Sequence, residues 1–464
     1  MRPPSGGHDP FSCALGAESS YYARMHRFLT SLFLLTALVA PRVSLAAGLA
    51  GVYIAEFTTG PTAEKQYARV SISTDGTKVS GTWGDRTIGG TITGAKVELT
   101  LADAAGPAGS LSGTLNGAAV SGTGTIKPMT RGGFGGGTPQ PSAITWSLTP
   151  YTPPASPKTY DFEPTSFYST YSAQWAPVLR IYPGDSVRTR TVDNDRDAAA
   201  TRYGVGGNPS TGPFYIEGAL PGDTLVVHLK KVRANKKTAR QGTRINARAI
   251  TAQYLVNAKY DPAFSGEWNL DLEKGVATLA HPTETMKGFS VPIKAMLGCV
   301  SVAPSGMDQA RGTDLGTYGG NLDYNDNVEG TTLYFPVYHA GALFGIGDAH
   351  AAMGDAEVTG SALETSADVE FSVDVIKGEN YPQVRAETAD YLISFGVSGS
   401  VAESIQAATA QLADWLKADY KMNDSEVALF LGAVAKYDIA ELVDPHVNIV
   451  AKVPRSALTS FKKR

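Results

Sequence analysis

The chain has few cysteines, few charged side chains and no long apolar run beyond its N-terminal region. Its 464 residues include two cysteines, Cys13 and Cys299, and charged residues make up 18% of the composition. With so few thiols a disulfide framework is excluded, so stability must come from the burial of apolar side chains. The formal net charge of −4 and the shortage of basic runs give little support for a nucleic-acid groove. No later stretch is long and apolar enough for a stable membrane span.

Glycine is abundant instead, with 50 residues. A glycine-rich, weakly charged composition is typical of a β-rich globular protein with many tight turns. The length is sufficient for two domains. We therefore expect a mainly β protein with some α-helix (α+β). An N-terminal antiparallel β-sandwich or barrel is expected first, followed by a larger β-rich domain that ends in helices.

The N-terminus carries a processing pattern that starts at Met25. Residues 1–24 are mostly polar, and we interpret them as a non-native upstream extension. Residues 25–47 combine a charged start, a short apolar run and the small residues Ala46 and Ala47, which is typical of a signal peptide. A short anchor that stays attached is the alternative. Cleavage would remove Cys13 and export the protein to the periplasm or the medium, leaving Cys299 as a buried structural thiol.

Residues 48–150 differ from the rest in their Gly, Thr and Ser content and in their period-two apolar pattern. Turn signals at 75–76, 89–90 and 116–117 predict stacked hairpins, which make up an accessory β-module. A loop is expected at 131–142. The three prolines of residues 151–158 indicate an extended linker, and residues 159–464 then form the second domain.

The second domain should contain short strands followed by helices. The expected strands are residues 186–192, 224–232, 291–296, 332–337, 342–346 and 369–375. Ile405, Ala408, Leu412 and Trp415 recur at helical spacing within residues 401–420. Asn423 is a suitable N-cap for a second helix.

One glycine-bounded stretch, residues 319–364, gathers most of the side chains that could bind a metal. Asn321 and Asp323 precede an apolar strand pattern, and a second group follows it. That second group consists of Asp348, His350, Asp355 and Glu357. Carboxylates and an imidazole suit a divalent cation. Asp348 and His350 are spaced i, i+2, so an extended backbone would point both to one side. Asp323 could equally form an Asx-turn, and Asp355 could be a turn residue.

The same residues carry a family resemblance. The motifs are GNPSTGPFYIEGA at 207–219, PGDT at 221–224, PIKAMLG at 292–298, GGNLD at 319–323 and GDAHAAMGDAE at 347–357. In this order they resemble the acetamidase/formamidase family over residues 160–454. The family commonly has glycine where this chain has Ala349 and Ala356, which bears on fine specificity.

The resemblance implies a catalytic second domain that hydrolyses a small linear carboxamide to a carboxylate and ammonia. It implies a divalent metal, with zinc the favoured ion, and a homo-oligomer. The expected metal ligands are Asp323, Asp348 and His350, the expected catalytic groups are Glu217 and Glu357, and the expected substrate-binding residues are Asn208 and Asn321. The metal would polarise the carbonyl and activate water, and Glu217 or Glu357 would move a proton to the leaving nitrogen.

Several alternatives stay open at this stage. Glu217 could instead be paired with Arg202 or Lys294. A secreted binding protein whose amidase-like half has lost turnover is the main rival function. Serine-type and nitrilase-type amidases are disfavoured because no serine signature is present and Cys299 has apolar neighbours. His281 is expected to be a loop histidine. His228 is expected to be a hydrogen-bonded core residue, with presentation to the site by the same strand as the alternative.

Overall fold

In the computed structural model, the described residues are 48–59, 64–127, 140–194, 207–306 and 308–463. The upstream extension and the signal peptide predicted for residues 1–47 lie outside these ranges. So do residues 131–139 of the predicted loop at 131–142, whose last residue, Ser142, lies in a strand. Those interpretations remain predictions.

Residues 51–150 form a closed barrel of eight antiparallel strands, so the barrel alternative is correct and the sandwich is not. Closure comes from pairing of the first strand with the last, with Tyr53 opposite Pro150 and Thr58 opposite Thr145. Alternate side chains point inward, as the period-two pattern predicts. The strands are β1 Gly51–Thr58, β2 Gln66–Asp75, β3 Lys78–Trp83, β4 Arg86–Thr93, β5 Lys96–Asp103, β6 Gly106–Asn116, β7 Ala119–Ile126 and β8 Ser142–Pro150.

Two of the three predicted turns of the barrel are confirmed. Gly76 lies between β2 and β3, and Gly117 lies between β6 and β7, both with positive φ. The turn predicted at Gly89-Gly90 is wrong, because both residues lie within β4. A Cβ on Gly90 would come within 2.1 Å of the Glu98 carbonyl oxygen. Glycine is therefore needed there for close approach of neighbouring strands.

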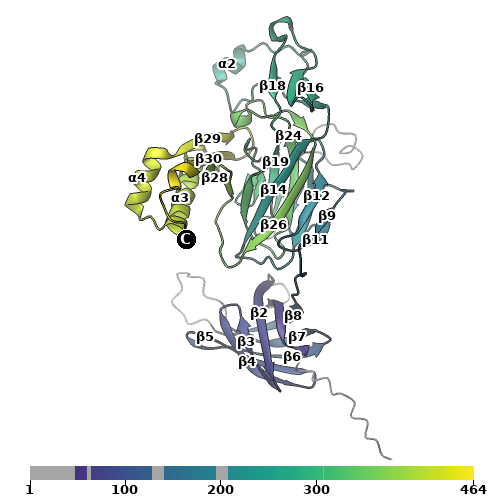
Figure 1. The fold of residues 1–464 in the computed structure, drawn as a ribbon, viewed down its shortest axis with the longest axis vertical. Helices are drawn as coiled ribbons and strands as arrows, with labels where there is room; N and C mark the ends of the chain where they lie inside the picture. Colours follow the sequence, from purple (N-terminus) through teal and green to yellow (C-terminus); the bar gives the residue numbers. More distant parts are fainter. Residues whose placement is uncertain (1–47, 60–63, 128–139, 195–206, 307, 464) are drawn as a thin grey trace, which may run out of the picture. The chain divides into compact units, whose positions relative to one another are not determined.

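The residues after the barrel form two large sheets (Figure 1). The nine-stranded sheet has the order β29-β30-β28-β27-β23-β14-β26-β12-β9. The eleven-stranded sheet follows the path β18-β17-β16-β15-β25-β24-β19-β22-β21, with β13 paired to β24 and to β11. A further pair joins β10 and β20.

The strands of the nine-stranded sheet are β9 Thr159–Asp161, β12 Ser186–Arg190, β14 Thr224–Ala234, β23 Thr332–Pro336, β26 Ala367–Ile376, β27 Arg385–Glu387, β28 Tyr391–Ser398, β29 Lys436–Glu441 and β30 Val447–Pro454. Those of the eleven-stranded sheet are β11 Leu179–Ile181, β13 Ser210–Ile216, β15 Thr238–Arg240, β16 Glu267–Asp271, β17 Val276–Leu279, β18 Ser290–Pro292, β19 Met296–Ser301, β21 Leu315–Gly316, β22 Gly319–Asn321, β24 Phe344–His350 and β25 Glu364–Thr365. The separate pair is β10 Thr170–Ser172 and β20 Gln309–Arg311.

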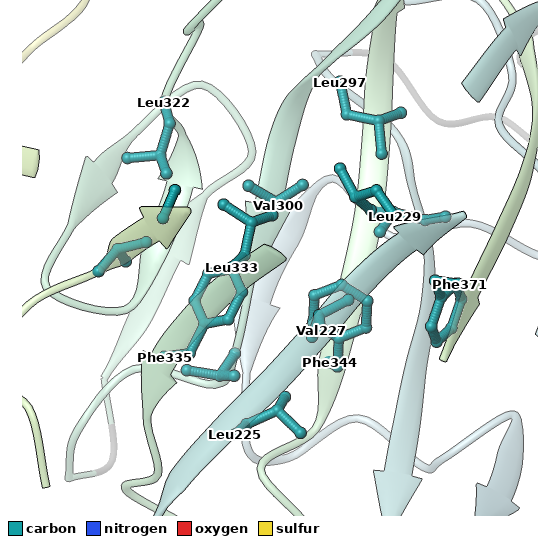
Figure 2. Packing of buried hydrophobic residues seen from close by; sticks show 14 of the residues in the cluster. Leu225, Val227, Leu229, Leu297, Val300, Leu322, Leu333, Phe335, Phe344 and Phe371 are labelled. Atoms are coloured by element: carbon teal, nitrogen blue, oxygen red, sulfur yellow. The ribbon is translucent and has the colours of Figure 1, made fainter. Parts of the chain in front are cut away.

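The main apolar core draws its side chains from both sheets (Figure 2). Leu225, Val227 and Leu229 of β14 meet Val300 of β19 and Phe344 of β24 in one cluster. A strand with one face buried against another sheet needs apolar residues at alternate positions. Four strands expected on this pattern, at 186–192, 224–232, 332–337 and 369–375, are confirmed as β12, β14, β23 and β26.

Two expected strands are displaced. Ala342 and Leu343 have φ of 55° and 61°, which is incompatible with a strand, so β24 starts at Phe344 and continues to His350. The run predicted at 291–296 falls between β18 and β19, so only its ends are extended.

The helices follow the predicted pattern closely. The two C-terminal helices, α3 Val401–Tyr420 and α4 Asp424–Val434, pack on β28 and β30. Asn423 forms a capping box with Glu426 at the start of α4. Ile405 is the exception to the predicted apolar face, since it is exposed.

The remaining helical elements are α2 Ala252–Asn257, η2 Glu284–Met286, η3 Asp355–Glu357 and η4 Arg455–Leu458. None of the helices in the described ranges combines the length and apolar character that crossing a membrane requires. The predicted fold class, mainly β with C-terminal helices, is confirmed.

Candidate metal centre

A buried group of acidic side chains surrounds His350 at the end of β24. Asp348 lies on the same strand, and Asp323 follows β22. Glu357 ends η3, and Glu364 begins β25 directly across from His350. These segments are far apart in sequence, yet the eleven-stranded sheet and its loops bring the side chains together. All of them are buried.

His350 faces a different set of carboxylates with each ring nitrogen. Its Nδ1 lies 3.9 Å from Asp323 Oδ1. Its Nε2 lies 3.2 Å from Glu364 Oε2 and 3.7 Å from Asp348 Oδ1. Two overlapping ligand groups result, Asp323 with His350 and Glu357, and Asp348 with His350 and Glu364. The ligand atoms of each group lie within 4.8 Å of one another.

Several polar atoms of this cluster have no hydrogen-bond partner among the described residues. They are Asp323 Oδ1, Asp348 Oδ1 and both ring nitrogens of His350. Leaving such atoms unsatisfied in the interior costs about 1–3 kcal/mol each. A divalent cation would satisfy them, since carboxylate oxygen and imidazole nitrogen are ligands of zinc and related metals. The residues present therefore fit a divalent metal, although this ligand set does not select zinc alone.

The backbone is strained where it presents these groups. Asp323, Asp348 and Glu357 have φ of 37°, 51° and 43°, in the left-handed region that non-glycine residues rarely adopt. Asn208, which also reaches the cluster, has φ of 53°. Strain of this kind costs of order 1–3 kcal/mol per residue and concentrates at functional sites. The strain therefore supports a functional role for the cluster.

The approach of Asp348 to His350 differs from the extended geometry expected of an i, i+2 pair. The positive φ of Asp348 interrupts the regular alternation of β24. Its Oδ2 accepts a hydrogen bond from Asn208 Nδ2 at 2.9 Å, while its Oδ1 faces His350. Gly298 makes room for this arrangement. A Cβ there would lie 2.3 Å from Asp323 Oδ1 and 2.9 Å from Asp348 Oδ2.

The two asparagines expected to bind substrate both lie in the cluster. Asn208 Nδ2 donates to Asn321 Oδ1 at 2.8 Å as well as to Asp348. Asn321 Nδ2 donates to Asp323 and, at 2.7 Å, to Asp444 Oδ2. Their amide groups therefore orient carboxylates. Binding of substrate by these residues stays a prediction.

Sequence reasoning missed three acidic residues, Glu364, Glu441 and Asp444. Glu364 ends the glycine-bounded stretch, so its position there was an available signal. Glu441 and Asp444 lie 77 and 80 residues after Glu364, with no motif to mark them. The Glu441 carboxylate accepts backbone hydrogen bonds from Val443 and Asp444 and lies next to Glu357.

Burial dominates the electrostatics. It raises the pKa of Asp323 and of Glu357 well above the usual carboxyl range, with a smaller contribution from neighbouring carboxylates. It also raises the pKa of Glu364 and of Asp444 to about 7. Burial by itself would lower the pKa of His350, but Glu364 and Asp348 outweigh it and raise that pKa. Without a cation the carboxyls therefore retain protons that metal binding would release.

The structure does not bring Glu217 into the cluster. Glu217 follows β13, whereas Asn208 precedes it, and a seven-residue strand spans roughly 20 Å. In the described part of the chain its carboxylate pairs with Arg180, with Nε to Oε1 at 2.6 Å. The alternative that Glu217 forms an ion pair is therefore correct, but its partner is Arg180. Lys294 pairs with Asp326 instead, and Arg202 lies outside the described residues.

The remaining candidate residues have structural surroundings. Asp355 accepts a hydrogen bond from Asn325 and is exposed. His228 Nδ1 is 3.0 Å from Thr332 Oγ1, and His281 lies near Glu267 on the surface. The contacts described for these two histidines do not include residues of the cluster, and His228 is partly exposed rather than in the core.

Cys299 is buried as predicted, but it touches the cluster. Its Sγ lies 2.9 Å from Asn321 Oδ1 and 4.0 Å from Asp348 Oδ2. Burial, reinforced by the charges of Asp348 and Asp323, raises the pKa of the thiol well above its usual value. A neutral thiol is a poor nucleophile, so the nitrilase-type alternative gains no support.

Comparison with known proteins finds similarity between the second domain and one family. A profile of the acetamidase/formamidase family matches residues 306–455. The acetamidase of Mycolicibacterium smegmatis is 26% identical over 219 residues, which are 36% of this chain and 53% of that protein. The formamidase of Methylophilus methylotrophus is 23% identical over 262 residues, which are 44% of this chain and 63% of that protein. The chain thus spans 53% and 63% of the length of these two relatives.

The similarity extends to a solved structure. The crystal structure of the acetamidase from Yersinia enterocolitica aligns with a TM-score of 0.56 and 26% identity, covering 66% of this chain and 94% of that one. The fold and the buried cluster define a β-rich protein with a carboxylate–histidine centre. The family match over residues 306–455, the two relatives and the solved structure all agree with the resemblance seen in the motifs, which is thereby confirmed.

Proposed function

We propose that the chain hydrolyses short linear carboxamides, of the formamide and acetamide type, to a carboxylate and ammonia. The observation that carries this proposal is the set of buried, unpartnered ligand atoms on Asp323, Asp348 and His350 in a chain that matches this family. The two sequence relatives are named an acetamidase and a formamidase. Both names point to the same reaction class.

The proposed cofactor is a divalent metal, with zinc the favoured ion. His350 would hold it either with Asp323 and Glu357 or with Asp348 and Glu364. When bound, the cation would supply Lewis-acid chemistry, polarising the amide carbonyl and lowering the pKa of water. His350 belongs to both ligand groups, so it is the residue on which metal binding depends most.

The chain's own residues orient the cluster and exclude bulk water. Asn208 and Asn321 hold the Asp348 and Asp323 carboxylates by hydrogen bonds. The groups are buried, so charges within the cluster interact more strongly than they would in water. The site is therefore preorganised for the negative charge that develops on the carbonyl oxygen of the amide.

Amide hydrolysis also needs a proton on the leaving nitrogen, because an amide anion leaves poorly. Glu357 is the proposed carrier when Asp348, His350 and Glu364 hold the cation, because Glu357 is then not a ligand and burial raises the pKa of its carboxyl. Glu441, beside it, accepts two backbone hydrogen bonds and holds its own position. Of the two residues expected to move this proton, Glu357 lies in the cluster, whereas Glu217 is paired with Arg180.

Metal analysis combined with an ammonia-release assay on acetamide and formamide tests the proposal. We expect one or two equivalents of a divalent metal, and loss of activity when a chelator removes it. Full activity in metal-free protein would end the metal part of the proposal. Metal occupancy without hydrolysis of any small or cyclic amide would favour the rival function, a secreted binding protein.

Export to the periplasm or the medium is proposed on the N-terminal pattern of residues 25–47. Mass spectrometry of the mature N-terminus after expression in a bacterial host tests it. Cleavage after Ala46 or Ala47 is expected. A chain that retains residues 28–40 would support the anchor alternative.

A further inference from the structure

Residues 441–448, here called the hairpin end, comprise the turn between β29 and β30 with the strand residues beside it. They belong to the nine-stranded sheet, whereas Asn321 ends β22 of the eleven-stranded sheet and Asp323 follows it. Three described contacts join the hairpin end to the segment that leads to Asp323. Side chains of one sheet therefore restrain a carboxylate that belongs to the other.

The first contact involves Asn321, whose amide group uses all of its hydrogen-bonding positions. Its Nδ2 donates to Asp323 and, at 2.7 Å, to Asp444 Oδ2. Its Oδ1 accepts from Asn208 Nδ2 at 2.8 Å and from Cys299 Sγ at 2.9 Å. A primary amide offers two donor and two acceptor positions, so all four are occupied. A reversed amide would place its oxygen against two carboxylates, so the network allows one orientation.

The other two contacts hold the backbone of the same segment. Asn448 Nδ2 donates to the Leu322 carbonyl at 2.6 Å, and both residues are fully buried. His446 Nδ1 lies 2.7 Å from Asp314 Oδ1. The Asp314 carbonyl in turn accepts the backbone N–H of Asn321 at 3.0 Å. The hairpin end therefore restrains both the side chain and the main chain beside the ligand carboxylate.

A buried carboxylate fixes the hairpin end itself. Glu441 is fully buried, and its Oε1 accepts the backbone N–H of Val443 and, at 2.8 Å, that of Asp444. Hydrogen bonds to a charged acceptor are about twice as strong as neutral ones. Asp444 is therefore presented to Asn321 by an anchored turn.

The restraint reaches both ligand groups of the cluster. Asn208 Nδ2 donates to Asn321 Oδ1 and also, at 2.9 Å, to Asp348 Oδ2. A misoriented Asn321 amide would disturb Asp323 directly and Asp348 through Asn208. The effect of the hairpin end therefore does not depend on which ligand group holds a cation.

We propose that the hairpin end positions the metal centre, and that Asp444 acts through Asn321 on the ligand carboxylates. This inference rests on the proposed function, because it concerns the ligands of the same centre. One oxygen of Asp323 is held by Asn321. The other, Oδ1, has no hydrogen-bond partner in the described chain and lies 3.9 Å from His350 Nδ1. Asp444 is thus a positioning residue, which controls the affinity for a cation without touching it.

The first test measures the affinity of the chelated protein for Co²⁺, whose visible absorption also reports ligand geometry. Asp444→Leu removes the acceptor at similar volume, so the affinity should fall about 10–100-fold and the spectrum should change. Asp444→Asn keeps an acceptor oxygen for Asn321 Nδ2 and should bind Co²⁺ nearly as the native chain does. This rescue separates the hydrogen bond from the charge.

Asp419→Leu is the matched control for the same titration. Asp419 is half-buried on α3, and its Oδ2 accepts a hydrogen bond from Trp415 Nε1 at 3.0 Å. The substitution therefore removes one negative charge and one hydrogen bond away from the centre. We expect native Co²⁺ affinity in this variant.

The second test needs neither metal nor reaction. NMR of chelated protein with isotope-labelled asparagine follows solvent exchange of the Asn321 side-chain amide, whose resonance is identified by its loss in Asn321→Gln. Both Nδ2 protons donate to carboxylates, so we expect slow exchange in the native chain. Exchange should be about 2–10-fold faster in Asp444→Leu, which lacks one of these hydrogen bonds, and unchanged in Asp444→Asn.

Thermal unfolding shows whether each variant folds, and His446→Leu replaces Asp444→Leu if the latter does not. The His446 side chain is 44% exposed, so its loss should not prevent folding. The variant loses the contact with Asp314, and its Co²⁺ affinity should fall by about 10-fold or less. Native affinity in this replacement would overturn the inference.

The outcomes separate the positioning role from the proposed function. Native Co²⁺ affinity in Asp444→Leu, or an equal loss in Asp419→Leu or Asp444→Asn, would overturn the positioning role and leave the metal centre intact. A native chain that binds no Co²⁺ would refute the metal part of the proposed function, and the exchange rates would then decide. Faster exchange in Asp444→Leu alone would support the positioning role, and equal rates in all variants would overturn it.

Discussion

The barrel and the two-sheet domain each have an apolar core, but they differ in the charged side chains that they bury. Within the described barrel, the buried residues are apolar except for Arg86. Trp83 and Trp146 meet edge to face at its centre, with ring centroids 6.0 Å apart. The two-sheet domain instead buries Asp323, Asp348 and several further carboxyls. A filled apolar interior provides stability, whereas buried, unpartnered carboxyls are retained only where chemistry uses them.

The backbone shows the same contrast. Barrel glycines such as Gly81 and Gly122 sit where a Cβ would come within 2 Å of a carbonyl oxygen on the next strand. They serve strand packing. Gly298 serves the cluster, since a Cβ there would meet two carboxylates. These differences favour the two-sheet domain as the place of the chemistry. Four predictions test that assignment.

The largest effect is expected for His350→Ala. His350 belongs to both ligand groups, so its loss should abolish metal binding. Amidase activity should fall by more than about 100-fold, because the loss of a residue that only supports a ligand already costs about 10–100-fold. Elemental analysis and ammonia release measure both quantities. His228→Ala is the control, since His228 lies on β14 away from the cluster and should keep activity. Native metal content in His350→Ala would refute the centre.

Glu364→Gln should have the next largest effect. Its Oε2 is 3.2 Å from His350 Nε2, so the change should weaken metal affinity about 10–100-fold. Glu217→Gln is the matched variant, because the half-exposed pair with Arg180 is worth about 0–1 kcal/mol and should leave activity within a few fold. Competitive metal titration and kcat/KM separate the two. A larger loss in Glu217→Gln would restore its catalytic role.

Removal of the metal should leave a protein whose free energy of unfolding falls as pH rises. The pKa of Glu364 is raised by burial from 4.5 to about 7, so the folded chain holds a proton that the unfolded chain releases between these values. Stability of the chelated protein should therefore fall as pH rises through that window, by on the order of 3 kcal/mol. Asp444 acts in the same direction. Thermal unfolding from pH 4.5 to 7.5 measures this.

Added zinc should restore the lost stability at pH 7.5, because a bound cation offsets the buried negative charge. Chelated protein that is equally stable at pH 5 and pH 7.5 would contradict the assignment of these raised pKa values.

The smallest effect on activity is expected from the barrel. Trp83→Ala should destabilise the barrel by about 3–5 kcal/mol, because it removes a large, fully buried side chain. The activity of folded protein at 25 °C should remain within about two-fold. Calorimetry and ammonia release on the same sample test this. A parallel loss of activity would show that the barrel contributes to catalysis.

Much of the fold could be predicted from local patterns. Period-two alternation marked the barrel strands, and the Asn423 capping box marked the start of α4. The Gly89-Gly90 turn was wrong because glycine serves both turns and close strand packing, and sequence does not distinguish these uses. Strand β24 was displaced because Ala342 and Leu343 adopt positive φ without being glycine.

The site was only partly predictable for a physical reason. Asp323, Asp348, His350 and Glu357 were found because ligand-type residues clustered in one stretch, and that stretch turned out to be folded around one strand. Glu217 shared a motif with Asn208 but lies at the opposite end of β13. Glu441 and Asp444 reach the cluster from β29 and the turn after it, with no local signal.

The sequence by itself determined which residues alternate, where helices are capped and which side chains could bind a metal, because these depend on neighbours within a few positions. Only the tertiary structure decided which carboxyls converge on His350 and which one pairs with Arg180 instead. Those outcomes depend on pairing between distant strands, since β24 pairs with β13, β19 and β25.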